Sequence, residues 1–284
     1  SNDVLKNGAV ISFPKGWSAN GADATGLTEE QVFCIPAGVT GDYYRQATWS
    51  VPEATYTDGT TVTEGVPSYD SENNEFTYTL DSSKFDQGNK KLVGWTVKDG
   101  EYKSQSGVLT FNAVYLDFAT RGGAYIKVNS AEDSGLRWMT DVNKTDYEAL
   151  TAIAAETGAT VEFGTELTTD KLTTALKIVT ERWGDTGEDT KTFNGVLTDL
   201  ASDYYSWEFV AKGYVKVTYS DGTESVIYAS YTEELVKRSI KIVASSALAD
   251  VRDEEEGAYV YPTEDGKYSA YTEEQRNILS QIAK

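Results

Sequence analysis

Short β-branched and aromatic runs separated by turn residues fill the first 117 positions, a pattern typical of β-strands. Two Asp-Gly pairs, Asp58-Gly59 and Asp99-Gly100, each lie between two such runs, and Asp-Gly readily adopts the conformation of a tight hairpin turn. A further strand is predicted at residues 108–116. Residues 28–31, Thr-Glu-Glu-Gln, have a helix-capping pattern, although residues 32–35 favour a strand. The first part is therefore predicted to be all-β.

From Ala124 onwards the pattern becomes mixed α and β. The capping-box pattern at residues 145–148 predicts a helix that ends at Gly158. The spacing of Leu172, Leu176 and Val179 predicts a second, shorter helix.

The remaining elements of this second part are a hairpin and two helices. Asp221-Gly222 separates two apolar runs and predicts the clearest hairpin of the chain. The first helix is predicted from an apolar face formed by Val236, Ile240, Val243 and Ala247. The last helix is predicted from the cap at residues 272–275 and the apolar residues Ile278, Leu279 and Ile282 that follow it. Residues 250–266 between them are acidic and rich in turn residues, which indicates a surface excursion.

Arg121-Gly122-Gly123 indicates a linker or a sharp turn, so we place a boundary near residues 117–123. Residues 1–117 are predicted to form an all-β domain and residues 118–284 an α+β domain.

Charge and composition exclude several classes of function. The 284 residues include no histidine, one cysteine, 25 Lys and Arg, and 45 Asp and Glu, which gives a net charge of −20. Without histidine there is no Ser-His-Asp nucleophile and no His-ligated metal, and one cysteine excludes an internal disulfide. The negative charge repels phosphate backbones and anionic lipids, so we expect no nucleic-acid partner and no membrane insertion. No cofactor is predicted either.

Carboxylate chemistry remains open, and a glycosidase needs two carboxylates about 5–9.5 Å apart. Glu162 and Glu208 are the candidates, because each lies in a strand-like apolar segment. Arg137 and Arg238 lie in similar segments, and four such charges more often form a structural ion-pair network than an active site. We therefore predict structural ion pairs, no catalytic residue and no enzyme activity.

Sugar binding would need exposed planar aromatic side chains. Adjacent aromatics on a strand point to opposite faces, so the candidates for glycan stacking are Tyr43, Tyr44, Tyr204, Tyr205 and Trp207. Edge packing is the favoured alternative, and Trp95 and Trp138 are predicted to lie in the core. The acidic residues at 185–189 and 250–256 are read as solvated loops rather than calcium ligands.

Residues 91–96, 100–102 and 108–115 (Lys-Leu-Val-Gly-Trp-Thr, Gly-Glu-Tyr and Val-Leu-Thr-Phe-Asn-Ala-Val-Tyr) resemble the closing half of an internalin-type B repeat. These repeats are small β-grasp-like modules of bacterial surface proteins.

The second part resembles an uncharacterised domain of secreted and cell-surface proteins of Gram-positive bacteria. The matching segments are Ser134–Trp138, Val161–Thr165, Glu208–Val215, Arg238–Ile240 and Tyr271–Gln275. The resemblance implies a place, the outside of a Gram-positive cell, and no known activity.

Together these points predict a β-rich, two-domain fold: an N-terminal all-β domain, β-grasp-like or Ig-like, and then an α+β domain with an antiparallel sheet and three to four helices. We expect a non-catalytic extracellular or cell-wall module, part of a longer exported polypeptide, that acts in adhesion or as a spacer. Its expected partner is a glycan or a protein of a host or cell surface. The alternative is a carbohydrate-binding accessory module, and the third reading is a carboxylate-dependent glycoside hydrolase.

Overall fold

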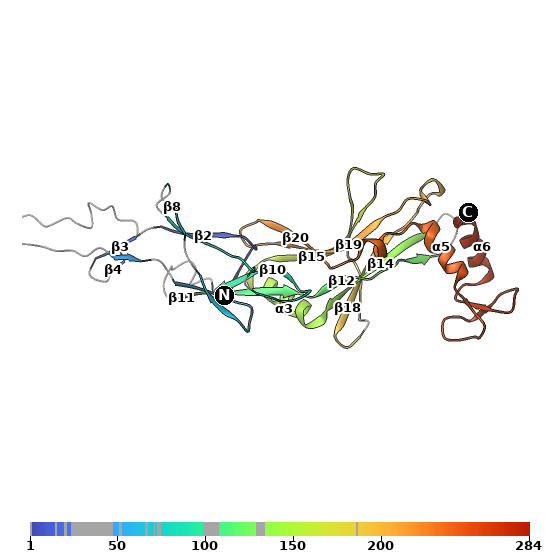
Figure 1. Ribbon diagram of the computed structural model, residues 1–284, viewed down its shortest axis with the longest axis horizontal. Coiled ribbons are helices and arrows are strands. Elements are labelled where there is room, and N and C mark those ends of the chain that lie inside the picture. The colour runs from blue at the N-terminus through green and yellow to red at the C-terminus, as the bar shows by residue number, and fades with distance from the viewer. Residues whose placement is uncertain are drawn as a thin grey trace, which may run out of the picture.

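The computed structural model describes residues 2–14, 16–19, 22–23, 48–50, 53–65, 68–70, 72, 75–83, 85–98, 108–128, 134–185 and 187–284. Strands predominate in this part of the chain, which confirms the predicted β-rich character. The sheets follow one another along the long axis of the molecule, and the C-terminal helices lie at one end (Figure 1).

The first large sheet has the strand order β1-β10-β11-β6-β7. Its strands are β1 (Asn2–Leu5), β6 (Glu53–Thr57), β7 (Val62–Glu64), β10 (Lys91–Lys98) and β11 (Val108–Leu116). Strands β11 and β6 pair in parallel and the other neighbours pair antiparallel. The rings of Tyr56, Trp95 and Phe111 pack together in its core, so Trp95 is buried as predicted.

The predicted hairpin at Asp58-Gly59 is confirmed by the antiparallel pairing of β6 and β7. The Asp58 carboxylate accepts hydrogen bonds from the backbone N–H of Thr60 and Thr61, and Gly59 has φ +98°. Strand β11 also has its predicted bounds. The predictions for residues 28–35 and for the Asp99-Gly100 turn lie outside the described residues.

Two small three-stranded sheets accompany this sheet, with strand orders β2-β9-β8 and β4-β3-β5. Their strands are β2 (Val10–Pro14), β3 (Gly16–Ala19), β4 (Ala22–Asp23), β5 (Thr48–Ser50), β8 (Ser68–Asp70) and β9 (Glu75–Thr79).

Two further antiparallel sheets pack face to face and form a sandwich, which we call the central sandwich. One sheet has the order β12-β14-β18-β17, with β13 also on β14, and the other has the order β16-β15-β19-β20. The strands are β12 (Phe118–Thr120), β13 (Tyr125–Lys127), β14 (Gly135–Asn143), β15 (Thr160–Thr168), β16 (Leu176–Val179), β17 (Trp183–Asp185), β18 (Thr190–Leu197), β19 (Val210–Thr218) and β20 (Glu224–Tyr228). Strands β19 and β20 form the predicted hairpin at Asp221-Gly222.

Glycines let the two sheets of the central sandwich approach closely. A Cβ added at Gly195 on β18 would overlap the side chain of Thr165 on β15, and one added at Gly213 on β19 would overlap Thr140 on β14. The backbone N–H of Gly213 donates to Thr120 Oγ1 at 2.8 Å, and the hydroxyls of Thr120 and Thr140 share a hydrogen bond at 3.2 Å. These strand glycines therefore mark a close backbone approach, as interior strand glycines often do.

Helix α3 (Lys144–Thr157) covers one end of the central sandwich and buries Leu150 and Ala154. The predicted stop is confirmed, because Gly158 adopts the left-handed conformation with φ +75°. The start lies slightly earlier than the capping pattern predicted: the Asn143 side chain accepts a hydrogen bond from the N–H of Asp146 and caps the helix.

Two helix predictions need correction. Leu176 and Val179 lie on strand β16 and not on a helix, because residues 176–179 pair with residues 164–167 of β15. The predicted face from Val236 to Ala247 is divided between α4 (Glu233–Val236) and α5 (Ile240–Ala249). The break follows from the Ser239 side chain, which accepts a hydrogen bond from the N–H of Ile242 and starts a new helix.

Helices α5 and α6 (Glu273–Ile282) close the far end of the molecule over a core that contains Trp138, Ile240 and Leu279. The predicted capping box of α6 is confirmed, since Thr272 and Gln275 exchange hydrogen bonds with each other's backbone. The acidic segment before α6 contains only short strands: β21 (Val251–Arg252), β22 (Tyr261–Pro262) and β23 (Tyr268–Ser269). Among the described residues, no helix is long and apolar enough to cross a membrane.

The first sheet and the central sandwich share a hydrophobic core. Val4, Val93 and Val114 of the first sheet pack in one cluster with residues such as Val217 and Tyr219. The Tyr219 hydroxyl lies 2.7 Å from the Val93 carbonyl and donates a hydrogen bond to it. Arg121-Gly122-Gly123 is a sharp turn between β12 and β13, with φ +87° at Gly123. The division into two domains stays a prediction.

We predict that Gly213→Ala lowers the free energy of unfolding by about 1–3 kcal/mol, because the added methyl group overpacks the interface at Thr140. Gly184→Ala on β17 is the matched control, since a Cβ there meets nothing within 4 Å. Urea unfolding of both variants measures the difference. Equal stability of the two variants would contradict the proposed close approach.

Candidate functional site

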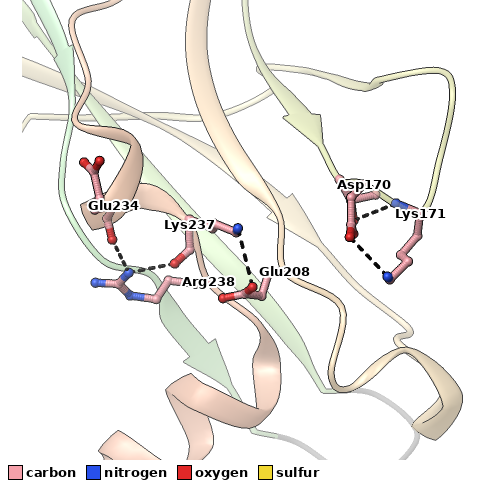
Figure 2. Close-up of polar contacts among 7 residues, drawn as sticks. Asp170, Lys171, Glu208, Glu234, Lys237 and Arg238 are labelled. Atoms are coloured by element: carbon pink, nitrogen blue, oxygen red, sulfur yellow. Dashed lines mark hydrogen bonds and ion pairs between the residues drawn. The ribbon is translucent and has the colours of Figure 1, made fainter.

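A polar cleft of about 390 Å³ lies beside helix α4. The turn after β15, the residues just before β19 and α4 itself form its walls (Figure 2). The lining residues are Thr168, Thr169, Asp170, Lys171, Ser206, Glu208, Val210, Glu233 and Lys237. Phe209 and Arg238 form two backbone hydrogen bonds with each other, which holds Glu208 next to Lys237.

Four of the five charged side chains that, among the described residues, line this cleft form ion pairs. Lys237 Nζ lies 3.5 Å from Glu208 Oε2, and Lys171 Nζ lies 3.1 Å from Asp170 Oδ2. The hydrogen bond from Lys171 lowers the pKa of the Asp170 carboxyl, and the charges of Lys171 and Lys237 act in the same direction. The cleft therefore suits electrostatic contact with polar groups.

The predicted ion pairs of Glu162 and Glu208 with Arg137 and Arg238 do not form, and each of these side chains has another partner. Arg238 donates to the backbone carbonyls of Glu234 and Lys237 (Figure 2). Arg137 stacks over the Tyr125 ring at 5.3 Å, and Glu162 accepts a hydrogen bond from the Tyr214 hydroxyl at 3.3 Å.

The reason is the alternation of side chains along each strand. Leu136 and Trp138 are buried, so Arg137 between them points away from the sandwich on the outer side of its sheet. Phe163 and Thr165 point inward on β15, which places Glu162 on the outer side of the opposite sheet.

Glu162 and Glu208 also lie near opposite ends of the ladder between β15 and β19. Glu162 is opposite Lys216, while Thr168 is opposite Val210, two residues after Glu208. Six residues along a strand span roughly 20 Å. This is far more than the separation of a glycosidase carboxylate pair, so the two do not face one substrate bond.

Glu166, which lies on the same outer face of β15 as Glu162, was not predicted from the sequence. Glu166 is only 9% exposed and accepts a hydrogen bond from the Tyr228 hydroxyl at 2.9 Å. Gly164 lies between the two glutamates and leaves room for the Tyr214 ring. The alternation Glu162-Phe163-Gly164-Thr165-Glu166 is the signal that could have placed both carboxylates on one face.

Burial and the neighbouring carboxylates keep two tyrosines protonated. Burial first, and the Glu162 charge second, raise the pKa of Tyr214 to about 12. Burial and the hydrogen bond to Glu166 raise the pKa of Tyr228 to about 12. These phenols therefore act as hydrogen-bond donors that hold the two carboxylates in place.

We predict that this tyrosine pair makes the fold sensitive to alkali. A tyrosine whose pKa is raised on folding stabilises the protein fully below its ordinary value of 10.0, and this contribution is lost as the pH rises through about 12. Tyr214→Phe removes one phenol with a raised pKa, so the free energy of unfolding should fall less steeply between pH 10.0 and about 12. Tyrosinate absorbance and denaturant unfolding measure the two effects; unchanged curves would contradict the assignment, and Tyr228→Phe provides a parallel case.

The aromatic candidates divide between the surface and the core. Ser202–Tyr204 form a 3₁₀ turn, η1, and not a strand, so strand alternation does not apply there. Tyr204 is 43% exposed and packs edge-on against Trp207, with ring centroids 4.7 Å apart. Tyr205 and Trp207 are half-buried against the core below α5. Tyr43 and Tyr44 lie outside the described residues.

No cluster of three or more acidic or cysteine side chains in the described part of the chain is arranged to hold a metal ion. A search of protein-family models and a search of curated proteins both find no match to this chain.

We predict that the Glu208–Lys237 pair contributes little to stability, because both side chains are about half exposed. A double-mutant cycle with Glu208→Gln and Lys237→Met should give a coupling below about 1 kcal/mol. Lys171→Met serves as a neighbouring exposed control. A coupling well above that value would show that the pair organises the cleft.

Proposed function

We propose that this chain is a non-catalytic module of an extracellular bacterial protein that spaces or presents neighbouring domains, or acts in adhesion. The observation that carries the proposal is the extended, continuous arrangement of its sheets along one axis (Figure 1). A spacer needs length, and it needs junctions that do not fold back on themselves.

The contact between the first sheet and the central sandwich supports such stiffness. Tyr219 is 3% exposed, donates to the Val93 carbonyl and shares a hydrogen bond with Ser225 Oγ at 2.6 Å. Gly94 beside it is tightly surrounded, because an added Cβ would lie 3.0 Å from the Leu5 carbonyl and 3.3 Å from the Tyr219 ring. A buried, hydrogen-bonded junction resists bending more than a polar linker does.

The contacts of the candidate carboxylates also favour a structural role. Glu162 is held by Tyr214 and Glu208 by Lys237, at separate places on the molecule. The segments that resemble Gram-positive surface domains contribute to strands β14, β15 and β19 and to the caps of α5 and α6. The extracellular location rests on this resemblance and on the acidic composition.

We expect small-angle X-ray scattering of the purified chain to give an elongated particle. A compact globule of 284 residues would have a radius of gyration of roughly 19 Å. A clearly larger radius and an asymmetric distance distribution support the spacer role, whereas a value near that of a globule contradicts it. Labelling of intact cells of the native organism with a membrane-impermeant reagent tests the location, with a cytosolic enzyme as the control.

Carbohydrate binding is the second candidate function. The observation that favours it is the presence of half-buried aromatic side chains beside polar groups, as at Tyr147 and Trp183. Aromatic rings offer the flat apolar surface on which the C–H face of a sugar packs.

A further inference from the structure

A second cleft, of about 510 Å³, lies at the other end of strand β15. Helix α3, the first residues of β15 and the segment from Val179 to Trp183 surround it. Its volume falls within the range of about 300–1,000 Å³ typical of small-molecule sites. The cleft is separate from the polar cleft beside α4, with which it shares no lining residue.

One wall of this cleft is aromatic. The ring centroid of Trp183 lies 4.9 Å from that of Tyr147 and 4.9 Å from that of Phe163. Lys191 Nζ lies over Tyr147 at 4.8 Å and over Trp183 at 5.6 Å, so cation–π contacts also hold these rings. Phe163 is buried, and the half-buried Tyr147 and Trp183 form a preorganised apolar surface.

The lining of the cleft also includes hydroxyl and charged groups. Glu162 uses one oxygen to accept from Tyr214, and a carboxylate has several acceptor positions, so it can accept further hydrogen bonds. The Thr151 hydroxyl donates to the Tyr147 and Glu148 carbonyls, which leaves its oxygen as an acceptor. Lys216 lies 3.3 Å from Glu224 and has additional N–H donors.

The charges of the cleft lining cancel. Among the described residues that line the cleft, Glu162 and Lys216 are the only ones of the Asp, Glu, Lys and Arg types, in a chain whose net charge is −20. Just outside the lining, Lys191 lies beside the rings and Glu224 beside Lys216, which adds one charge of each sign. A phosphorylated or carboxylated ligand would meet no surplus of cations, and a cationic ligand would meet no surplus of carboxylates. The lining therefore matches a neutral ligand with one apolar face and several hydroxyl groups.

We propose that this cleft binds a neutral saccharide of one or two rings, with the C–H face of a sugar against Trp183 and Tyr147 and its hydroxyls at Glu162, Thr151 and Lys216. The proposal rests on the second candidate function, carbohydrate binding, and is independent of the spacer role. The carbohydrate site is thus placed at this cleft and not at Tyr204 and Trp207, the glycan-stacking candidates predicted from the sequence.

Isothermal titration of the full chain with di- to tetrasaccharides of glucose, mannose, galactose, xylose and N-acetylglucosamine tests the proposal. At least one series should bind. Trp183→Ala should weaken that binding by at least about ten-fold, in line with the loss of one aromatic contact. Glu162→Gln, which keeps the shape of the side chain, should weaken it by a smaller factor.

Two further variants keep the result decisive. Thr151→Trp fills the cleft from the surface of α3 and should abolish binding even if Trp183→Ala unfolds, which thermal melting would show. Tyr204→Ala is the matched aromatic control and should bind as the unmodified chain does. Binding that is lost in Tyr204→Ala but kept in Thr151→Trp would overturn the cleft while supporting carbohydrate binding, and no binding by the unmodified chain would overturn both.

Discussion

The close approach of the two sheets in the central sandwich is the constraint on which the rest of the structure depends. Gly195 against Thr165 and Gly213 against Thr140 bring strands so near that no other side chain fits at the two glycines. At Gly213 the approach buries polar groups, which would be costly without partners. The Thr120 and Thr140 hydroxyls and the Gly213 N–H satisfy one another, so the contact is both tight and hydrogen-bonded. Strand β12, which contributes Thr120, also bonds to Ser230 after β20 and joins the two sheets at one side.

This approach determines which side chains face outward. Once Thr140 and Thr165 point inward, alternation sends Arg137 to one outer face and Glu162 and Glu166 to the other. Opposite charges on different faces cannot pair across the core, so each finds a neighbour on its own sheet. The result is a set of local contacts, such as Tyr214 with Glu162, in place of one buried ionic network.

Local chemistry explains which elements the sequence could predict. The Asp58-Gly59 and Asp221-Gly222 turns, the stop at Gly158 and the capping box before α6 depend on residues within a few positions of one another. Residues 172–179 show the opposite case: helical spacing is present there, but pairing of β16 with a distant strand decides the outcome. Glu166 lies opposite Lys177 of β16, so its burial depends on that same pairing, which no single window of sequence contains. The position of Glu208 depends on a different long-range contact, the backbone bridge between Phe209 and Arg238.

The same register also explains why the aromatic cleft exists. Strand β15 begins at Thr160, but β16 pairs with it only from Gly164 to Leu167. Residues 160–163 are therefore bordered by β19 on one side and left without strand pairing on the other, apart from the hydrogen bond from the Thr180 N–H to the Phe163 carbonyl. Helix α3 and Trp183 approach this uncovered edge without filling it, which leaves a hollow with an aromatic wall. Because β16 ends four residues short of the start of β15, a sheet edge stays uncovered and becomes a recess with an aromatic wall.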